Sequence, residues 1–123
     1  MSHSVLVYGT LRPGTNKEVV IIKGQMRSLG GFPGISLVGD EDIVCERITD
    51  VDDARLARLD MLEGYREESP EGSMYIRQKY NDDWIYIYNS PMNGRPMVPN
   101  GDWLAYAKTP VGSNSRLLTM EIA

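Results

Sequence analysis

Cysteine and histidine each occur only once in the 123 residues, as Cys45 and His3. One cysteine excludes an internal disulfide and any metal site built from several thiolates. We expect Cys45 to be a small buried side chain in an apolar run, and His3 to lie in a frayed terminus. Nucleophilic pairs with histidine are therefore excluded. Chemistry must come from carboxylates, tyrosines, arginines or the backbone.

Long apolar runs and basic clusters are also missing. The run VVII at 19–22 is far shorter than the roughly 20 residues that span a bilayer, and no leader pattern opens the chain. We therefore expect a cytoplasmic protein without a membrane partner. A net charge of -4 with no basic cluster argues against a nucleic-acid partner. The sequence indicates no particular oligomeric state.

The length and composition are those of an ordinary soluble domain, with 41% hydrophobic and 24% charged residues in 123. We expect a single domain over 1–123, with a tail from about residue 108 that is flexible or folds over a cleft. Residues 16–23 form either a short helix or a strand, because β-branched side chains compete with helical spacing. The glycine-rich stretch 30–34 predicts a turn, and 43–48 predicts a strand.

One amphipathic helix is predicted at about 51–62. Thr49 or Asp50 is the expected N-cap, and Gly64 is the expected stop. The apolar face that this helix presents has four members: Val51, Leu56, Leu59 and Leu62.

Glu63 follows the same helical spacing, seven residues after Leu56 and four after Leu59. If it points inward, burial and the negative end of the helix dipole both raise its pKa, which suits proton transfer near neutral pH. The alternative is a solvent-facing glutamate at the helix end, and spacing alone slightly favours that alternative.

The second half of the chain predicts a β-hairpin. Residues 74–80 and 84–89 are rich in β-forming side chains and flank a polar turn at 81–83. Residues 65–73 read as a mobile loop and 90–100 as an irregular connection. Tyr75 could offer a hydroxyl beside a site, although structural tyrosines are commoner.

The stretch 5–14, VLVYGTLRPG, predicts a buried strand that ends in a binding loop. Gly9 allows a ligand to approach free backbone N–H groups at the strand end. Arg12 could add a fixed positive charge. An ordinary turn after a strand is the plainer interpretation of this stretch alone.

Together, VLVYGTLRPG, LDMLEGY, MYIRQ and GDWL resemble the gamma-glutamylcyclotransferase-like family, close to its gamma-glutamylamine cyclotransferase and AIG2-like branch. The resemblance implies an α+β fold, with a closed, barrel-like mixed sheet, one or two packed helices and a cavity at its mouth. It implies Glu63 as the catalytic acid/base. The implied substrate-binding residues are Tyr8, Gly9, Thr10, Leu11 and Tyr75. The segment between Glu63 and Tyr75 is longer and more acidic than in that branch, which bears on substrate choice.

The implied reaction is intramolecular aminolysis of a small gamma-glutamyl compound. Its α-amino nitrogen attacks the γ-carbonyl and releases 5-oxoproline with a free amine or amino acid. One carboxylate can serve as base and then as acid, so we expect no metal or cofactor. Two alternatives remain open: a non-catalytic module that binds a small molecule in the same cavity, and an interaction protein that uses the fold as a scaffold.

Overall fold

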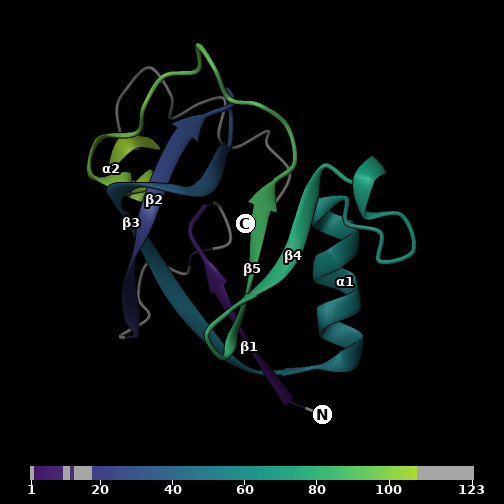
Figure 1. Cartoon of the computed structure of the whole chain (residues 1–123). Helices are drawn as coiled ribbons and strands as arrows, with labels where there is room; N and C mark the ends of the chain where they lie inside the picture. The colour runs from purple at the N-terminus through teal and green to yellow at the C-terminus, as the bar shows by residue number, and fades with distance from the viewer. Residues whose placement is uncertain (1, 10–11, 13–17, 108–123) are drawn as a thin grey trace.

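A curled, five-stranded mixed sheet forms the centre of the computed structural model, which describes residues 2–9, 12 and 18–107 (Figure 1). The strands lie in the order β2-β3-β1-β5-β4. Their bounds are β1 Ser2–Val7, β2 Val19–Ser28, β3 Pro33–Asp52, β4 Tyr75–Tyr80 and β5 Asp83–Tyr88. The helical elements are α1 Asp53–Glu63, η1 Pro70–Gly72, η2 Pro99–Gly101 and α2 Trp103–Ala107.

The sheet is a half-barrel. β3 is 20 residues long and pairs antiparallel with β2 along its first part and with β1 along its last part. The register shifts at Gly24, where an added Cβ would stand 2.2 Å from the Ser36 carbonyl oxygen. The expected α+β class and barrel-like mixed sheet are confirmed, with the barrel half closed rather than fully closed.

β1 and β5 run parallel, with Val5 beside Trp84 and Leu6 beside Ile85. Their carboxyl ends therefore lie at the same edge of the sheet. The other three pairings are antiparallel. The predicted hairpin is confirmed as β4 and β5, joined by a turn at 81–82.

The stretch whose structure the sequence left open, 16–23, contributes residues 19–23 to β2. Val19 and Ile21 are each about half exposed, whereas Ile22 is buried. The strand is at the sheet edge and carries apolar residues on both faces, which hides the alternation that marks a half-buried strand.

Two apolar cores lie on opposite faces of the sheet. One lies inside the curl, where α2 packs, and includes Tyr8, Cys45 and Trp103. The other lies under α1 and includes Leu56, Leu59 and Tyr75. The expected burial of Cys45 is confirmed.

The helix is confirmed with a corrected start. α1 begins at Asp53, and the Asp52 side chain caps it by accepting a hydrogen bond from the Arg55 N–H at 2.8 Å. Thr49 and Asp50 were the wrong caps, because β3 continues to Asp52, which pairs with Ser2. No helix among the described residues is long and apolar enough to cross a membrane.

His3 is not frayed, which corrects a second expectation. It pairs with Val51 in the sheet, and its Nε2 lies 2.6 Å from a carboxylate oxygen of Asp53. The domain bounds remain a prediction, and the tail expected from about residue 108 lies outside the described residues.

Candidate active site

Glu63 is the last residue of α1 and is fully buried. The inward orientation is therefore correct, and the solvent-facing alternative is wrong. The helix stops at Gly64, whose φ of 67° and ψ of 33° are left-handed, and whose N–H meets the Asp60 and Met61 carbonyls. Glycine adopts this conformation at little cost, so the helix ends just after Glu63 and leaves its side chain inside the protein.

Three fully buried tyrosines interact electrostatically with Glu63: Tyr8, the residue after β1, Tyr75 of β4 and Tyr86 of β5. Tyr8 donates its hydroxyl proton to the Tyr86 carbonyl, and Tyr75 donates to the Pro33 carbonyl at 2.6 Å. The Tyr86 hydroxyl donates to a carboxylate oxygen of Asp60 at 2.7 Å. Each ring is therefore held in place by its own hydrogen bond.

The pKa values of these three tyrosines are raised by two causes that they share. Burial is the largest cause that raises the pKa of each phenol. The negative charge of Glu63 is a further, smaller cause that raises the pKa of all three phenols. The phenols therefore stay protonated at neutral pH. The raised pKa expected for Glu63 itself stays a prediction.

Asp60 and Arg77 lock α1 against the hairpin. Asp60 lies one turn before Glu63, and its second carboxylate oxygen accepts a hydrogen bond from the Arg77 guanidinium at 2.9 Å. Arg77 also stacks on the Trp84 ring, 4.5 Å from its centroid. Burial raises the pKa of Asp60, although the Tyr86 and Arg77 contacts act against the shift. Asp60 and Tyr86 were not predicted from the sequence. Asp60 could have been found from its position three residues before Glu63, and Tyr86 from the alternation of side chains in WIYIY.

Gly9 is buried directly after β1, next to Tyr8. The Arg12 N–H donates to the Gly9 carbonyl at 3.0 Å. The Arg12 guanidinium binds a carboxylate oxygen of Glu46 at 2.7 Å and one of Asp102 at 3.0 Å. The Arg12 side chain is only 8% exposed. Its positive charge, which we expected to be available to a ligand, instead pairs this loop with β3 and with the residue before α2.

The structure thus brings together Glu63, Tyr8 and Tyr75, with Gly9 adjacent to Tyr8. Thr10 and Leu11 lie outside the described residues, and the roles of all six residues stay predictions. Burial raises the pKa of the nearby Cys45 thiol to about 12, so it stays protonated and inert. Within the described ranges no three His, Cys, Asp or Glu side chains form a group that could hold a metal ion.

Comparison with known proteins identifies relatives. The chain is 32% identical over 115 residues to the gamma-glutamylcyclotransferase family protein YtfP of Escherichia coli K12, covering 81% of this chain and 95% of that protein. The solution structure of the Escherichia coli protein matches with a TM-score of 0.61 and 29% identity, over 85% of this chain and 99% of that one.

A crystal structure of an uncharacterized Pyrococcus horikoshii protein shares the fold, with a TM-score of 0.58 at 20% identity over 82% of this chain and 89% of that one. The profile of the family described as gamma-glutamyl cyclotransferase, AIG2-like, matches residues 5–105. That range contains both the buried glutamate and the strand end beside it, and the chain belongs to the gamma-glutamyl cyclotransferase, AIG2-like family.

Proposed function

We propose that this chain is a gamma-glutamylcyclotransferase-type enzyme that releases 5-oxoproline and a free amine or amino acid from a small gamma-glutamyl compound. The observation that carries the proposal is the full burial of the Glu63 carboxylate at the end of α1, where it interacts electrostatically with three neutral tyrosines. Burying a carboxylate costs folding free energy. Family membership makes proton transfer on a gamma-glutamyl substrate the natural use.

The proposed reaction needs no co-reactant. The α-amino nitrogen of the substrate attacks its own γ-carbonyl carbon, and a C–N bond forms while Glu63 accepts the proton of that amine. The bond from the same carbon to the leaving nitrogen then breaks, and Glu63 returns the proton to that nitrogen. Since the phenols do not ionise at neutral pH, only Glu63 in this cluster can act in both directions.

Two further parts of the site support the proposal. The tetrahedral intermediate carries an oxyanion that needs N–H donors, and the segment Tyr8, Gly9, Thr10 and Leu11 is the proposed source. The anchoring of Arg12 to Glu46 and Asp102 holds the far side of this segment. Holding the substrate curled, with its amine near its γ-carbonyl, supplies the proximity that an intramolecular reaction needs.

The test is release of 5-oxoproline, measured by mass spectrometry on a panel of gamma-glutamyl amino acids, gamma-glutamyl amines and gamma-glutamyl-lysine. Turnover of at least one member is expected. Binding of the same compounds is measured in parallel by calorimetry. Binding without release from any compound would overturn the enzyme and favour the alternative, a binding module that uses the same cavity.

A further inference from the structure

The geometry points to a subsite for the leaving group, in which Arg27 binds a carboxylate on the amino acid that is released. This inference rests on the proposed function and deepens it. It selects gamma-glutamyl compounds whose leaving group is an amino acid or a peptide, and it disfavours gamma-glutamyl amines that lack a carboxylate there.

The subsite is a cavity of about 330 Å³ beside the end of β5. Its walls come from β2, β3, the end of β5 and the segment that follows it, and include Arg27, Gln25, Ser36, Tyr88 and Ser90. Ligand cavities in proteins start at about 300 Å³. This cavity is therefore large enough to hold the leaving amino acid.

Arg27 lines this cavity with a positive charge that no carboxylate offsets within the described part of the chain. Its Nε donates to the Gln25 side-chain oxygen at 3.1 Å, and its Nη1 donates to the Arg95 carbonyl at 2.7 Å. Both acceptors are neutral. They hold the guanidinium in one orientation and leave its other N–H groups for a ligand. A guanidinium held in one orientation can bind a planar carboxylate through two parallel hydrogen bonds.

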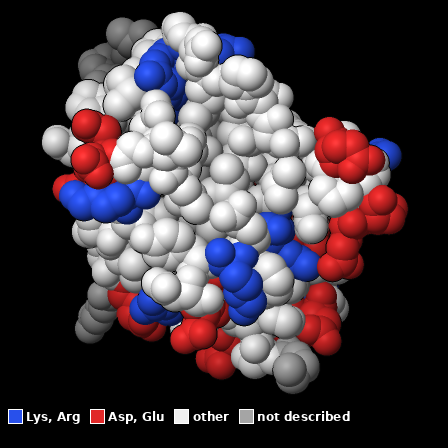
Figure 2. All heavy atoms as spheres, viewed as in Figure 1, with Lys and Arg blue, Asp and Glu red and all other residues white. Residues whose placement is uncertain are grey.

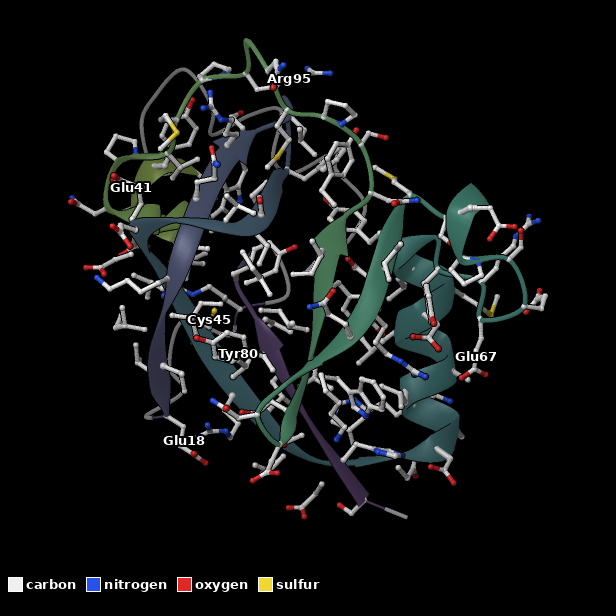
Figure 3. The ribbon with its side chains drawn as sticks, viewed as in Figure 1. Glu18, Glu41, Cys45, Glu67, Tyr80 and Arg95 are labelled. Carbon is white, nitrogen blue, oxygen red and sulfur yellow. The ribbon has the colours of Figure 1, made fainter. Side chains whose placement is uncertain are left out.

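The surroundings of Arg27 reinforce this charge. Arg95 is on the segment after β5, and Figure 3 labels it at the top of the molecule. Figure 2 shows Lys and Arg atoms at the top of the same face, with no Asp or Glu atoms directly beside them. A ligand carboxylate would approach a locally positive surface on a protein whose net charge is -4.

One aromatic contact links the cavity to the candidate active site. Tyr88 forms part of its wall, and its ring meets the Tyr75 ring edge-on with centroids 5.5 Å apart. The charge of Glu63 in turn contributes to the raised pKa of Tyr75. The parallel pairing of β1 and β5 puts Gly9 and the segment after Tyr88 at the same sheet edge. A γ-carbonyl held near Gly9 and Glu63 would therefore direct its leaving group toward Arg27.

The experiment compares two substrates that differ only in the carboxylate: gamma-glutamyl-alanine and gamma-glutamyl-ethylamine. The ratio of their kcat/KM values is measured for the wild type, Arg27→Gln and Arg27→Lys. Arg27→Gln is expected to lower the ratio about tenfold or more, mainly through KM, because a charge-assisted hydrogen bond is lost. Arg27→Lys is expected to recover part of it. Arg58→Gln, which removes an exposed charge from α1, is the matched control.

If Arg27→Gln leaves the ratio of the two kcat/KM values unchanged, even when both values fall, the subsite is overturned and the proposed function stays intact. Binding to the Glu63→Gln variant provides the independent arm, measured for the same two compounds without turnover. Tighter binding of gamma-glutamyl-alanine that Arg27→Gln abolishes supports the subsite even if the wild type releases no 5-oxoproline. Equal affinity for the two compounds contradicts it.

Discussion

Single side chains in this molecule hold the site through hydrogen bonds to the backbone as much as to one another. Tyr75 and Tyr8 both donate to main-chain carbonyls, of Pro33 and Tyr86 respectively. Their hydroxyls are therefore committed before any substrate arrives. In the proposed reaction this preorganisation would lower the cost of organising the site around the substrate.

Tyr75→Phe tests this commitment. The substitution removes the hydroxyl and leaves the buried Pro33 carbonyl without that donor, which we expect to cost about 1–2 kcal/mol of unfolding free energy. Urea denaturation measures the change. Tyr80→Phe, at a half-buried ring in the same strand, is the control and should be near neutral. Equal midpoints for Tyr75→Phe and the wild type would contradict the assigned hydrogen bond.

Arg12→Leu tests the anchor of the strand-end loop. It takes the positive charge away from the Glu46 carboxylate, whose side chain is 1% exposed, so we expect a loss of about 3 kcal/mol in unfolding free energy.

The double variant Arg12→Leu with Glu46→Leu should recover much of that loss, because no buried charge is then left behind. A double-mutant cycle by chemical denaturation gives the coupling. Additive losses would show that the two side chains do not depend on each other.

Among the elements, α1 and the hairpin could be predicted from the sequence, and the structure explains why. The leucine spacing, the acidic first turn and Gly64 all predict the same helix. The same spacing predicts the inward position of Glu63, which is buried in the structure. The cap was misplaced because nothing local to 49–52 reveals that this stretch pairs with β1. Tyr86 was missed because alternation groups residues by face without saying which face meets the site.

Gly64→Ala tests the helix stop. The residue has a left-handed backbone, and an added Cβ would stand 3.2 Å from the Met74 Cβ. We expect a loss of about 1 kcal/mol or more in stability and a fall in kcat, because the end of α1 and Glu63 must shift.

Gly72→Ala is the matched control for that variant. Its added Cβ meets only the Ser69 hydroxyl at an ordinary 3.5 Å, and its φ is not positive. Thermal unfolding and steady-state kinetics are measured on both variants. A Gly64→Ala protein with wild-type melting temperature and kcat would contradict the account of how Glu63 is aimed.

At the scale of the whole molecule, the site depends on strands that are distant in sequence. β1 pairs with β5 about eighty residues away, and no local pattern in either strand specifies that partner. This pairing sets the end of β1 beside the cavity that contains Arg27. The family resemblance implied a barrel-like sheet with a cavity, but neither the resemblance nor the periodicity predicted the pairing of β1 with β5.

Asp83 joins three strands and gives a pH prediction. Both its carboxylate oxygens accept hydrogen bonds from Arg47 of β3 at 3.0 Å, and Ser4 of β1 donates to it as well. Burial acts to raise the pKa of Asp83, but these three donated bonds outweigh it and the pKa falls below 3.8. A lowered folded-state pKa contributes stability above the unfolded value, and this contribution is lost as the pH falls through the folded-state value.

The stability advantage of the wild type over Asp83→Asn should therefore be constant above about pH 5 and shrink as the pH falls below 3.8. Urea denaturation at several pH values measures both proteins. An advantage that grows in acid would contradict the assignment of this carboxylate as an ionised link between strands.

The central claim is that Glu63 moves the protons of a cyclotransferase reaction. The most direct test is the rate of 5-oxoproline release by Glu63→Gln, compared with the wild type on its best substrate, with the exposed Glu68→Gln as control. We expect Glu63→Gln to remain folded and to lose at least about a hundredfold in kcat, the range of general acid–base catalysis, while Glu68→Gln keeps the wild-type rate. A Glu63→Gln enzyme that releases 5-oxoproline at the wild-type rate would contradict the claim.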